Sequence, residues 1–295
     1  MCDPPATLFV VATPIGNLAD LSPRARDLLA SVDLIAAEDT RHSARLLEAW
    51  EIRTPLTSFH DHNAASRLPE LIGRLQAGDR LALITDAGTP LISDPGYRLV
   101  RAAQDAGIAV RALPGPSAAI AALSVAGLAC DRFTFEGFLP ARASARRKRL
   151  GELADEPRTM IFYESPRRLP AMLDDCVVAF GADRESALAR ELTKLHESLH
   201  RAPLSQLARM IGEGEEPARG ECVVLVAGAR GIQSGGHFAD ELLDALVGEG
   251  IGAKSAAAVA RRLTGQPRRK LYQRALELND QKEARNSQER RPPPR

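Results

Sequence analysis

Short apolar runs alternate with amphipathic stretches over roughly the first 220 residues, a pattern typical of buried strands between surface helices. The predicted strands are Leu8–Ala12, Leu34–Ala37, Leu81–Thr85, Ala109–Ala112, Thr134–Gly137, Thr159–Tyr163, Ser186–Arg190 and Cys222–Ala227. The predicted helices are Pro23–Ser31, Ser43–Trp50, Ala64–Gln76, Tyr97–Asp105, Pro166–Phe180 and Leu204–Gly212. Ser22 and Ser165 each precede a proline and are predicted to cap two of these helices. Such alternation predicts an α/β fold with largely parallel strand pairing.

Two segments rich in glycine and proline divide the chain. Leu113-Pro114-Gly115-Pro116 continues neither a strand nor a helix, so we expect α/β subdomains at 1–113 and 114–228. Gly228–Gly236 has the composition of a flexible linker. A small helical domain at 237–279 and a disordered polar tail at 280–295 are predicted to follow it, the helices being Phe238–Gly248, Ala253–Thr264 and Pro267–Leu278.

The composition is that of a globular protein, with 44% hydrophobic and 26% charged residues among 295. The first apolar run is too short for a signal peptide or a membrane span. The cysteines are far apart and form no CxxC pair, so neither a zinc site nor a disulfide framework is expected, and the cytoplasm is the natural compartment. They are Cys2, Cys130, Cys176 and Cys222.

Basic residues are concentrated in two segments, although the net charge is only +1. Residues 260–295 carry eleven basic and four acidic side chains, and Ala141–Arg149 carries five basic side chains and no acidic one. A solvated face is the simpler interpretation of each segment, but two of them on an otherwise acidic chain favour a polyanionic partner.

Several well-known motifs are absent. No G-x-G-x-x-G follows the first strand, and no H-E-x-x-H or G-x-S-x-G occurs. Gly248–Ser255 resembles a P-loop, but Ala253 replaces the second glycine and the segment joins two predicted helices. His60 and His62 flank Asp61, a spacing that is weak evidence for a metal, and no metal site is predicted.

Four loops with glycine or proline each follow an apolar strand: Thr13–Asn17, Asp86–Pro90, Leu113–Ser117 and Tyr163–Pro166. In open α/β sheets, ligands bind outside the carboxyl ends of the strands, where such loops meet. None of the four contains a lysine to hold phosphate, so a small molecule bound by backbone groups and hydroxyls is favoured. Simple turns would explain any one of these loops, but not all four together.

The blocks VATPIGNLADLSPRA, AAEDTRHSARLL, FHDHN, LITDAGTPLISDPGYRLV, PGPSAAIAAL, FEGFLP, FYESPRR and ARELTKLHE resemble, in order, the signature of one family. It is the bacterial ribosomal RNA small-subunit methyltransferase I family, within the tetrapyrrole-methylase superfamily. The resemblance implies methyl transfer from S-adenosylmethionine to the ribose 2′-oxygen of a cytidine in the 16S rRNA decoding region. It also implies a homodimer whose two α/β subdomains enclose the cofactor in a cleft, with a small C-terminal helical domain.

The resemblance also implies which residues bind the cofactor. In tetrapyrrole methylases the loop after this strand reads Gly-Asp-Pro, and Gly88-Thr89-Pro90 matches it with threonine in place of aspartate. That change puts a carboxylate contact in doubt, and Asp86 is a candidate substitute. Ser117 and Ala118 match positions near the methionine end or the ribose. The implied residues are Pro14, Gly16, Leu83, Asp86, Gly88, Thr89, Ile92, Ser117, Ala118, Phe162, Tyr163, Glu221 and Val223.

Transfer to a hydroxyl needs alignment of the reacting atoms and benefits from a general base. The candidate bases are Asp39, His60, Asp86, Glu164 and Glu197, and Arg41 and Lys194 are candidates for stabilising the developing oxyanion. A salt bridge or helix cap is the alternative role for each, and Asp39 is well placed to cap a helix.

RNA binding requires basic side chains near the site, which would contact phosphates. The candidates follow FEGFLP and the Tyr-Glu-Ser-Pro loop: Arg142, Arg146, Arg147, Lys148, Arg149, Arg167 and Arg168. A second candidate surface in the helical domain comprises Arg261, Arg262, Arg268, Arg269 and Lys270. Two other functions stay open: methylation of a tetrapyrrole carbon, and a non-catalytic RNA-binding ribosome-assembly factor.

Overall fold

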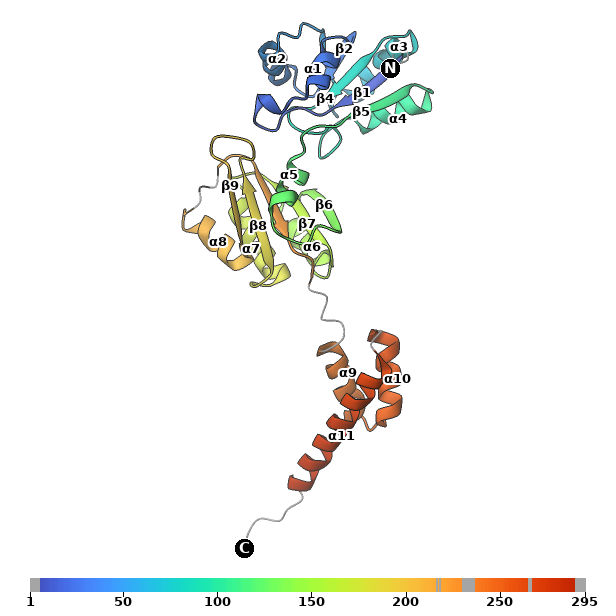
Figure 1. Ribbon diagram of the computed structural model, residues 1–295, viewed down its shortest axis with the longest axis vertical. Coiled ribbons are helices and arrows are strands. Elements are labelled where there is room, and N and C mark those ends of the chain that lie inside the picture. The colour runs from blue at the N-terminus through green and yellow to red at the C-terminus, as the bar shows by residue number, and fades with distance from the viewer. Residues whose placement is uncertain (1–5, 216, 218, 230–236, 265–266, 290–295) are drawn as a thin grey trace. The chain divides into compact units, whose positions relative to one another are not determined.

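The computed structural model describes residues 6–215, 217, 219–229, 237–264 and 267–289, and it divides into two compact units, Met1–Ala227 and Gly228–Arg295 (Figure 1). The first unit holds two five-stranded sheets flanked by helices, and the second is helical. The predicted fold class is therefore confirmed. Across the described part of the chain, no helix is long and apolar enough to cross a membrane.

The first sheet has the strand order β3-β2-β4-β1-β5, and every pairing in it is parallel. Strands β1, β2 and β4 are buried on both faces, which is usual for a parallel sheet covered by helices. The three-residue β3 is only half-buried and was not predicted, because so short a segment carries no periodic signal. The strands are β1 (Thr7–Val11), β2 (Leu34–Ala37), β3 (Leu56–Ser58), β4 (Leu81–Ile84) and β5 (Ala109–Leu113).

Alternate residues of these strands enter two different cores. Phe9, Ile35 and Ile84 pack against helices α1 (Pro23–Leu29) and α2 (Thr40–Ala49). On the other face, strand residues including Leu8 and Leu83 pack against α3 (Ala64–Gln76) and α4 (Tyr97–Asp105). The predicted cap of α1 is confirmed, since Ala25 N donates to Ser22 Oγ over 3.1 Å. A single 3-10 turn, η1 (Leu18–Asp20), precedes α1.

The second sheet, of order β6-β7-β10-β8-β9, departs from the predicted parallel pairing. Only β6 and β7 are parallel; β10 runs antiparallel to β7 and β8, and β8 runs antiparallel to β9. The reason is that the short Glu191–Glu197 loop connects β8 to β9, and parallel strands need a longer crossover. The edge strand β9 is half-buried and was also missed. The strands are β6 (Phe133–Phe138), β7 (Thr159–Glu164), β8 (Glu185–Arg190), β9 (Ser198–Pro203) and β10 (Cys222–Val226).

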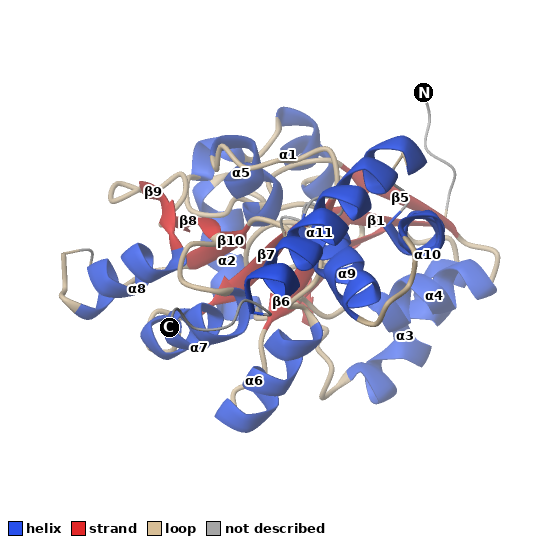
Figure 2. Ribbon diagram, turned by 90° about the horizontal axis from the view of Figure 1, so that it is seen from below, coloured by secondary structure: helices blue, strands red, loops and turns tan. Residues whose placement is uncertain are grey.

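Helix α5 (Ala118–Val125) covers one face of the second sheet, and the other face packs against α6 (Ala143–Glu152), α7 (Leu169–Phe180) and α8 (Leu204–Gly212) (Figure 2). Helix α7 begins three residues later than predicted. Ser165 is therefore not its cap; its carbonyl instead accepts from the backbone N–H groups of Arg168 and Leu169 in a preceding turn. Neither α5, which is almost wholly apolar, nor the strongly basic α6 shows a clear amphipathic pattern, and neither was predicted.

The second unit comprises α9 (His237–Gly248), α10 (Ala253–Thr264) and α11 (Arg268–Glu289), packed around Leu243, Ala257 and Leu271. Helix α11 extends to Glu289, so the disorder predicted from residue 280 is wrong for 280–289. Those residues are rich in Gln, Lys, Glu, Ala and Arg, which are good helix formers. The rest of that predicted tail, and most of the predicted linker, lie outside the described residues.

Candidate active site

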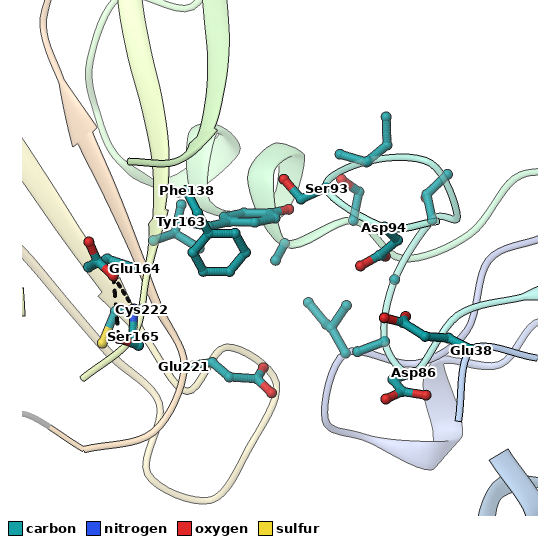
Figure 3. Close-up of a pocket in the computed structure, with 18 of the residues that line it drawn as sticks. Glu38, Asp86, Ser93, Asp94, Phe138, Tyr163, Glu164, Ser165, Glu221 and Cys222 are labelled. Atoms are coloured by element: carbon teal, nitrogen blue, oxygen red, sulfur yellow. Dashed lines mark hydrogen bonds between the residues drawn. The ribbon is translucent and has the colours of Figure 1, made fainter. Parts of the chain in front are cut away.

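A pocket of about 400 Å³ lies within the first unit, where loops of the first sheet face the ends of β6, β7 and β10 (Figure 3). The parallel strands contribute their carboxyl ends and the antiparallel β10 its amino end, as the topology requires. A volume of this size is typical of small-molecule sites. Nine of the thirteen residues predicted to bind the cofactor line it: Asp86, Gly88, Thr89, Ile92, Ser117, Ala118, Tyr163, Glu221 and Val223.

The loops of the first sheet are tied together by short polar contacts. Thr13 and Gly88 exchange two backbone hydrogen bonds, of 2.9 and 3.0 Å, and the Thr89 hydroxyl donates to the carbonyl of Pro116 over 3.0 Å. Gly88 has φ +86°, a backbone conformation that favours glycine. The threonine in Gly88-Thr89-Pro90 therefore joins two loops of the pocket wall.

Aromatic side chains form the opposite wall. The Tyr163 ring meets Phe135 and Phe138 edge-on, with ring centroids 5.0 and 5.7 Å away. The Tyr163 hydroxyl accepts from Ala119 N at the start of α5 over 3.0 Å, and burial raises the pKa of this hydroxyl. These contacts orient the Tyr163 ring, and Tyr163 and Phe138 together present apolar surface to the pocket (Figure 3).

Carboxylates dominate the electrostatics of the pocket. Its lining includes Glu38, Asp86, Asp94, Glu164 and Glu221, and no Lys, Arg or His is found among the described lining residues. Burial raises the pKa of Asp94 to about 6; the nearby Thr85 hydroxyl opposes the shift, and the charges of Glu38 and Asp86 add to it. The pocket is therefore suited to a ligand that carries positive charge.

The negative charges of two of these carboxylates, Glu164 and Glu221, are partly neutralised by Arg168 and Lys194, which do not line the pocket. Arg168 Nη2 lies 3.1 Å from Glu164 Oε2, and the other Glu164 oxygen accepts from Ser165 N. Lys194 Nζ lies 3.4 Å from Glu221 Oε2 and 2.9 Å from Glu191 Oε1. Glu38, Asp86 and Asp94 have no comparable contact with Lys or Arg among the described residues.

Four residues predicted to contact the cofactor do not line the pocket. Leu83 and Phe162 point into the cores on the far faces of β4 and β7, because neighbouring residues of a strand face opposite ways. Pro14 and Gly16 flank Ile15, and it is Ile15 that lines the pocket. A Cβ at Gly16 would lie 2.4 Å from Cγ of Lys194, so the lysine side chain crosses this glycine.

Of the predicted catalytic residues, only Asp86 and Glu164 line the pocket. Asp39 caps α2 by accepting from Arg41 N, and Arg41 is ion-paired back to Asp39 over 2.9 Å. His60 does not line the pocket, Lys194 lies behind Glu221, and Glu197 accepts from Thr193 N over 2.6 Å within its own loop.

Sequence reasoning missed several lining residues, including Glu38, Ser93, Asp94 and Phe138. For Glu38 there was a usable signal, because it directly follows a predicted strand at the carboxyl edge of a parallel sheet. Asp94 lies in a loop in which Leu91 and Ser93 adopt positive φ, and no local sequence rule predicts that path.

The basic segment around α6 is only partly available to RNA. Arg146 is buried, with its side chain 7% exposed and ion-paired to the equally buried Asp175 over 2.7 Å. The prediction that Arg146 contacts RNA is therefore wrong, because Arg146 lies on the buried side of α6, where its side chain meets Asp175 of α7. Arg168 is turned toward Glu164 and the Leu139 carbonyl. The exposed members are Arg142, Arg147, Lys148, Arg149 and Arg167.

Comparison with known proteins gives the family. Residues 7–208 match the tetrapyrrole (corrin/porphyrin) methylases, and residues 236–279 match the RsmI C-terminal HTH domain. The ribosomal RNA small subunit methyltransferase I of Pseudomonas aeruginosa is 53% identical over 274 residues, covering 92% of this chain and 97% of that protein. Its Escherichia coli O157:H7 counterpart is 49% identical over 271 residues, covering 92% and 94%. The chain belongs to the ribosomal RNA small subunit methyltransferase I family.

Solved structures support the fold of this methyltransferase. A cobalt precorrin-4 methyltransferase aligns with TM-score 0.58 and 15% identity over 75% of this chain and 95% of its own. A uroporphyrin-III C-methyltransferase from Thermus thermophilus, complexed with S-adenosyl homocysteine, aligns with TM-score 0.53 and 16% identity over 77% and 98%. The chain is an S-adenosylmethionine-dependent rRNA methyltransferase.

The pocket residues of this methyltransferase fit S-adenosylmethionine. The left-handed backbone of Gly88 allows close approach to a ligand, and Tyr163 and Phe138 offer faces to a planar ring. The carboxylates of Glu38 and Asp94 face a space that a cationic ligand would occupy. When bound, the cofactor supplies an activated methyl group.

Proposed function

We propose that the enzyme transfers the methyl group to the ribose 2′-oxygen of a cytidine in 16S rRNA of the small ribosomal subunit, in the cytoplasm, where ribosomes are found. The observation that carries the proposal is a carboxylate-lined pocket in a chain about half identical to named small-subunit rRNA methyltransferases. The pocket can hold a cationic donor while a carboxylate receives a hydroxyl proton.

Asp86 is the residue proposed to accept that proton. Asp86 and Glu164 are the predicted bases that line the pocket, and both Glu164 oxygens are already engaged by Ser165 and Arg168. Asp86 Oδ1 accepts from Asp39 N over 3.2 Å, whereas Oδ2 has no hydrogen bond or ion pair within the described part of the chain. Its side chain is 41% exposed at the pocket mouth, within reach of a macromolecular substrate.

The test of the reaction uses methyl-labelled S-adenosylmethionine and small subunits from a strain that lacks this modification. Label in one alkali-resistant dinucleotide containing a cytidine is expected, because 2′-O-methylation removes the hydroxyl that alkaline cleavage requires. Asp86→Asn should lower the single-turnover rate by about 10²–10⁴-fold. Label on a base atom, or an unchanged rate in the variant, would contradict the proposed acceptor or base.

RNA is proposed to approach over exposed basic side chains within α6 and just before it, the first of which, Arg142, lies four residues after Phe138 of the pocket. Arg142, Arg147 and Lys148 lie exposed there. The second proposed RNA surface is on the helical unit, where the basic residues of α10 and α11 are exposed: Arg261, Arg262, Arg268, Arg269 and Lys270. Affinity for small subunits should therefore fall steeply with salt.

A homodimer is proposed to cover the outer face of α5. This helix is apolar almost all round; one side packs on the second sheet, while Ile120 and Val125 are 52% and 50% exposed. An apolar face next to an active site favours a protein partner, and a second copy is the simplest one. Light scattering should give twice the chain mass for the wild type and a smaller mass for Ile120→Glu. A monomeric wild type would refute the dimer.

A further inference from the structure

Glu38 and Asp94 form an uncompensated pair of carboxylates in the pocket wall. Glu38 follows β2, and Asp94 lies in the loop between β4 and α4. The buried Thr85 lies next to both carboxylates and donates its hydroxyl proton to Glu38 Oε2 over 2.7 Å. Figure 3 shows both carboxylates on the pocket side opposite Tyr163 and Phe138.

The surroundings of this carboxylate pair lower the stability of the folded protein when no ligand is bound. Leu91 and Ser93, which lead into Asp94, have φ of +74° and +69°, a conformation disfavoured for residues other than glycine. The nearby charged and titratable groups are Asp86, a further acid, and Tyr163. Strained backbone and clustered like charges both destabilise the folded chain, and such features are expected where function requires them.

Methyl transfer changes the charge of the ligand in this pocket. The bonding electron pair stays on sulfur as the carbon–sulfur bond breaks, and the new carbon–oxygen bond forms while the hydroxyl proton passes to a base. The sulfonium thereby becomes a neutral thioether, and the rest of the ligand, including its amino and carboxylate groups, is unchanged. Only the interaction with the sulfonium charge differs between the donor and the product.

We infer that Glu38 and Asp94 make the pocket select the cationic methyl donor over the neutral thioether product. Resting on the proposed function, this assigns a specificity role to two residues outside the predicted cofactor set. The attraction between these carboxylates and the sulfonium strengthens binding of the donor. It is lost when the methyl group is transferred, so the product dissociates more easily than the donor.

The size of the effect follows from linkage. An opposite charge within about 4–6 Å shifts a carboxyl pKa by roughly 1–3 units. By reciprocity, the cation binds the ionised carboxylate more tightly by the same factor, about tenfold for each unit. For a sulfonium bound within that distance of Asp94, removing the charge of Asp94 should reduce the preference for the donor by at least about tenfold.

The experiment measures dissociation constants of S-adenosylmethionine and S-adenosylhomocysteine by calorimetry on the full-length protein, without RNA. The quantity compared is the ratio of the two constants, in which contacts common to both ligands cancel. Asp94→Asn and Glu38→Gln should each lower the preference for the donor at pH 7.5. Glu221→Gln is the matched control, because this pocket carboxylate is offset by Lys194, and it should change the ratio much less.

A second arm uses pH. The pKa of Asp94 is raised to about 6, so its charge is present at pH 7.5 and mostly lost at pH 5. The wild-type preference should fall across this range, whereas that of Asp94→Asn should change less. His42→Gln is measured in parallel because the His42 ring lies 3.9 Å from Asp86. A slope that disappears in His42→Gln and persists in Asp94→Asn would overturn the assignment to Asp94.

The outcomes separate this inference from the proposed function. Equal ratios in the wild type, Asp94→Asn and Glu38→Gln would overturn the inference and leave the methyltransferase assignment intact. An equal loss of affinity for both ligands would also overturn it, because it indicates a structural role for the carboxylates. Failure of the wild type to bind either ligand would refute the cofactor site itself.

Discussion

Arg146 and Arg147 are adjacent on α6 and contact the same carboxylate, yet replacing them should have opposite consequences. Arg146 and Asp175 are both 7% exposed, with Arg146 Nε donating to Asp175 Oδ2 over 2.7 Å. Arg147 reaches Asp175 Oδ1 over 2.8 Å but is 69% exposed. Burial acts to raise the pKa of Asp175, but hydrogen bonds from Arg147 and Arg146 outweigh it and hold that pKa below its usual range.

The magnitudes follow from burial. Removing one partner of a buried ion pair costs about 3–5 kcal/mol because the other charge is left uncompensated. Because Asp175 would keep only the solvent-exposed Arg147, Arg146→Ala should lose about 3 kcal/mol, near the lower end of that range. That is still a large fraction of the roughly 5–15 kcal/mol that stabilises an ordinary domain. Arg147→Ala should lose at most about 1 kcal/mol, since the Arg147 guanidinium is screened by water and Asp175 keeps its buried partner Arg146. RNA affinity should respond in the opposite way, falling in Arg147→Ala through loss of a phosphate contact.

Urea unfolding followed by circular dichroism, with hydrogen exchange resolved over α6 and α7, measures the stability. Exchange is needed because the sole tryptophan, Trp50, lies at the end of α2 and does not report on α6. Filter binding to small subunits, at a temperature where both variants are folded, measures the affinity. If Arg146→Ala unfolded like the wild type and lost RNA affinity, the interpretation of α6 would be wrong.

Three further predictions concern the pocket and its supports. Asp94→Asn should stabilise the free enzyme at pH 7.5 by roughly 1–2 kcal/mol after allowing for solvent screening, because the raised pKa makes the charged carboxyl unfavourable in the folded state. That gain should vanish below about pH 4 in urea titrations, where the wild-type carboxyl is protonated in both states. Gly16→Ala should lower the melting temperature by displacing the Lys194 side chain, and adding Lys194→Ala should restore most of the loss. Tyr163→Phe should cost about 1 kcal/mol in urea unfolding by leaving Ala119 N without its acceptor.

The sequence predicts much of the fold, for reasons that differ between the two sheets. Strands such as Leu34–Ala37 are buried on both faces, so they stand out as continuous apolar runs, and their predicted bounds match β2. The half-buried edge strand β9 carries no such run and was missed. Antiparallel pairing in the second sheet was missed with it, because the hairpin from β8 depends on recognising β9.

The pocket was predicted less completely, because strand alternation and loop path decide which neighbour faces the ligand. Tyr163 lines the pocket, whereas Phe162, one residue earlier, is fully buried on the other face of β7. A motif match identifies such a pair without saying which member points inward. Asp94 depends on two positive-φ residues in its loop, which no pattern of residue types reveals.

The loop after β1, which was predicted to bind the cofactor, also packs the first subdomain against the second. Ile15 packs into the core that α5 forms with the second sheet, although it belongs to the first subdomain. The Lys194 side chain crosses Gly16, and its ammonium lies 2.9 Å from Glu191 and 3.4 Å from Glu221, of which Glu221 lines the pocket. Pro14 restricts the backbone before Ile15, and Gly16 leaves space for the Lys194 side chain after it. Both residues therefore support the contact between the two subdomains, although neither lines the pocket. Substitutions at Pro14 or Gly16 should therefore impair cofactor binding through the alignment of Ile15 and Glu221, and a stability measurement distinguishes this indirect effect from the loss of a direct contact.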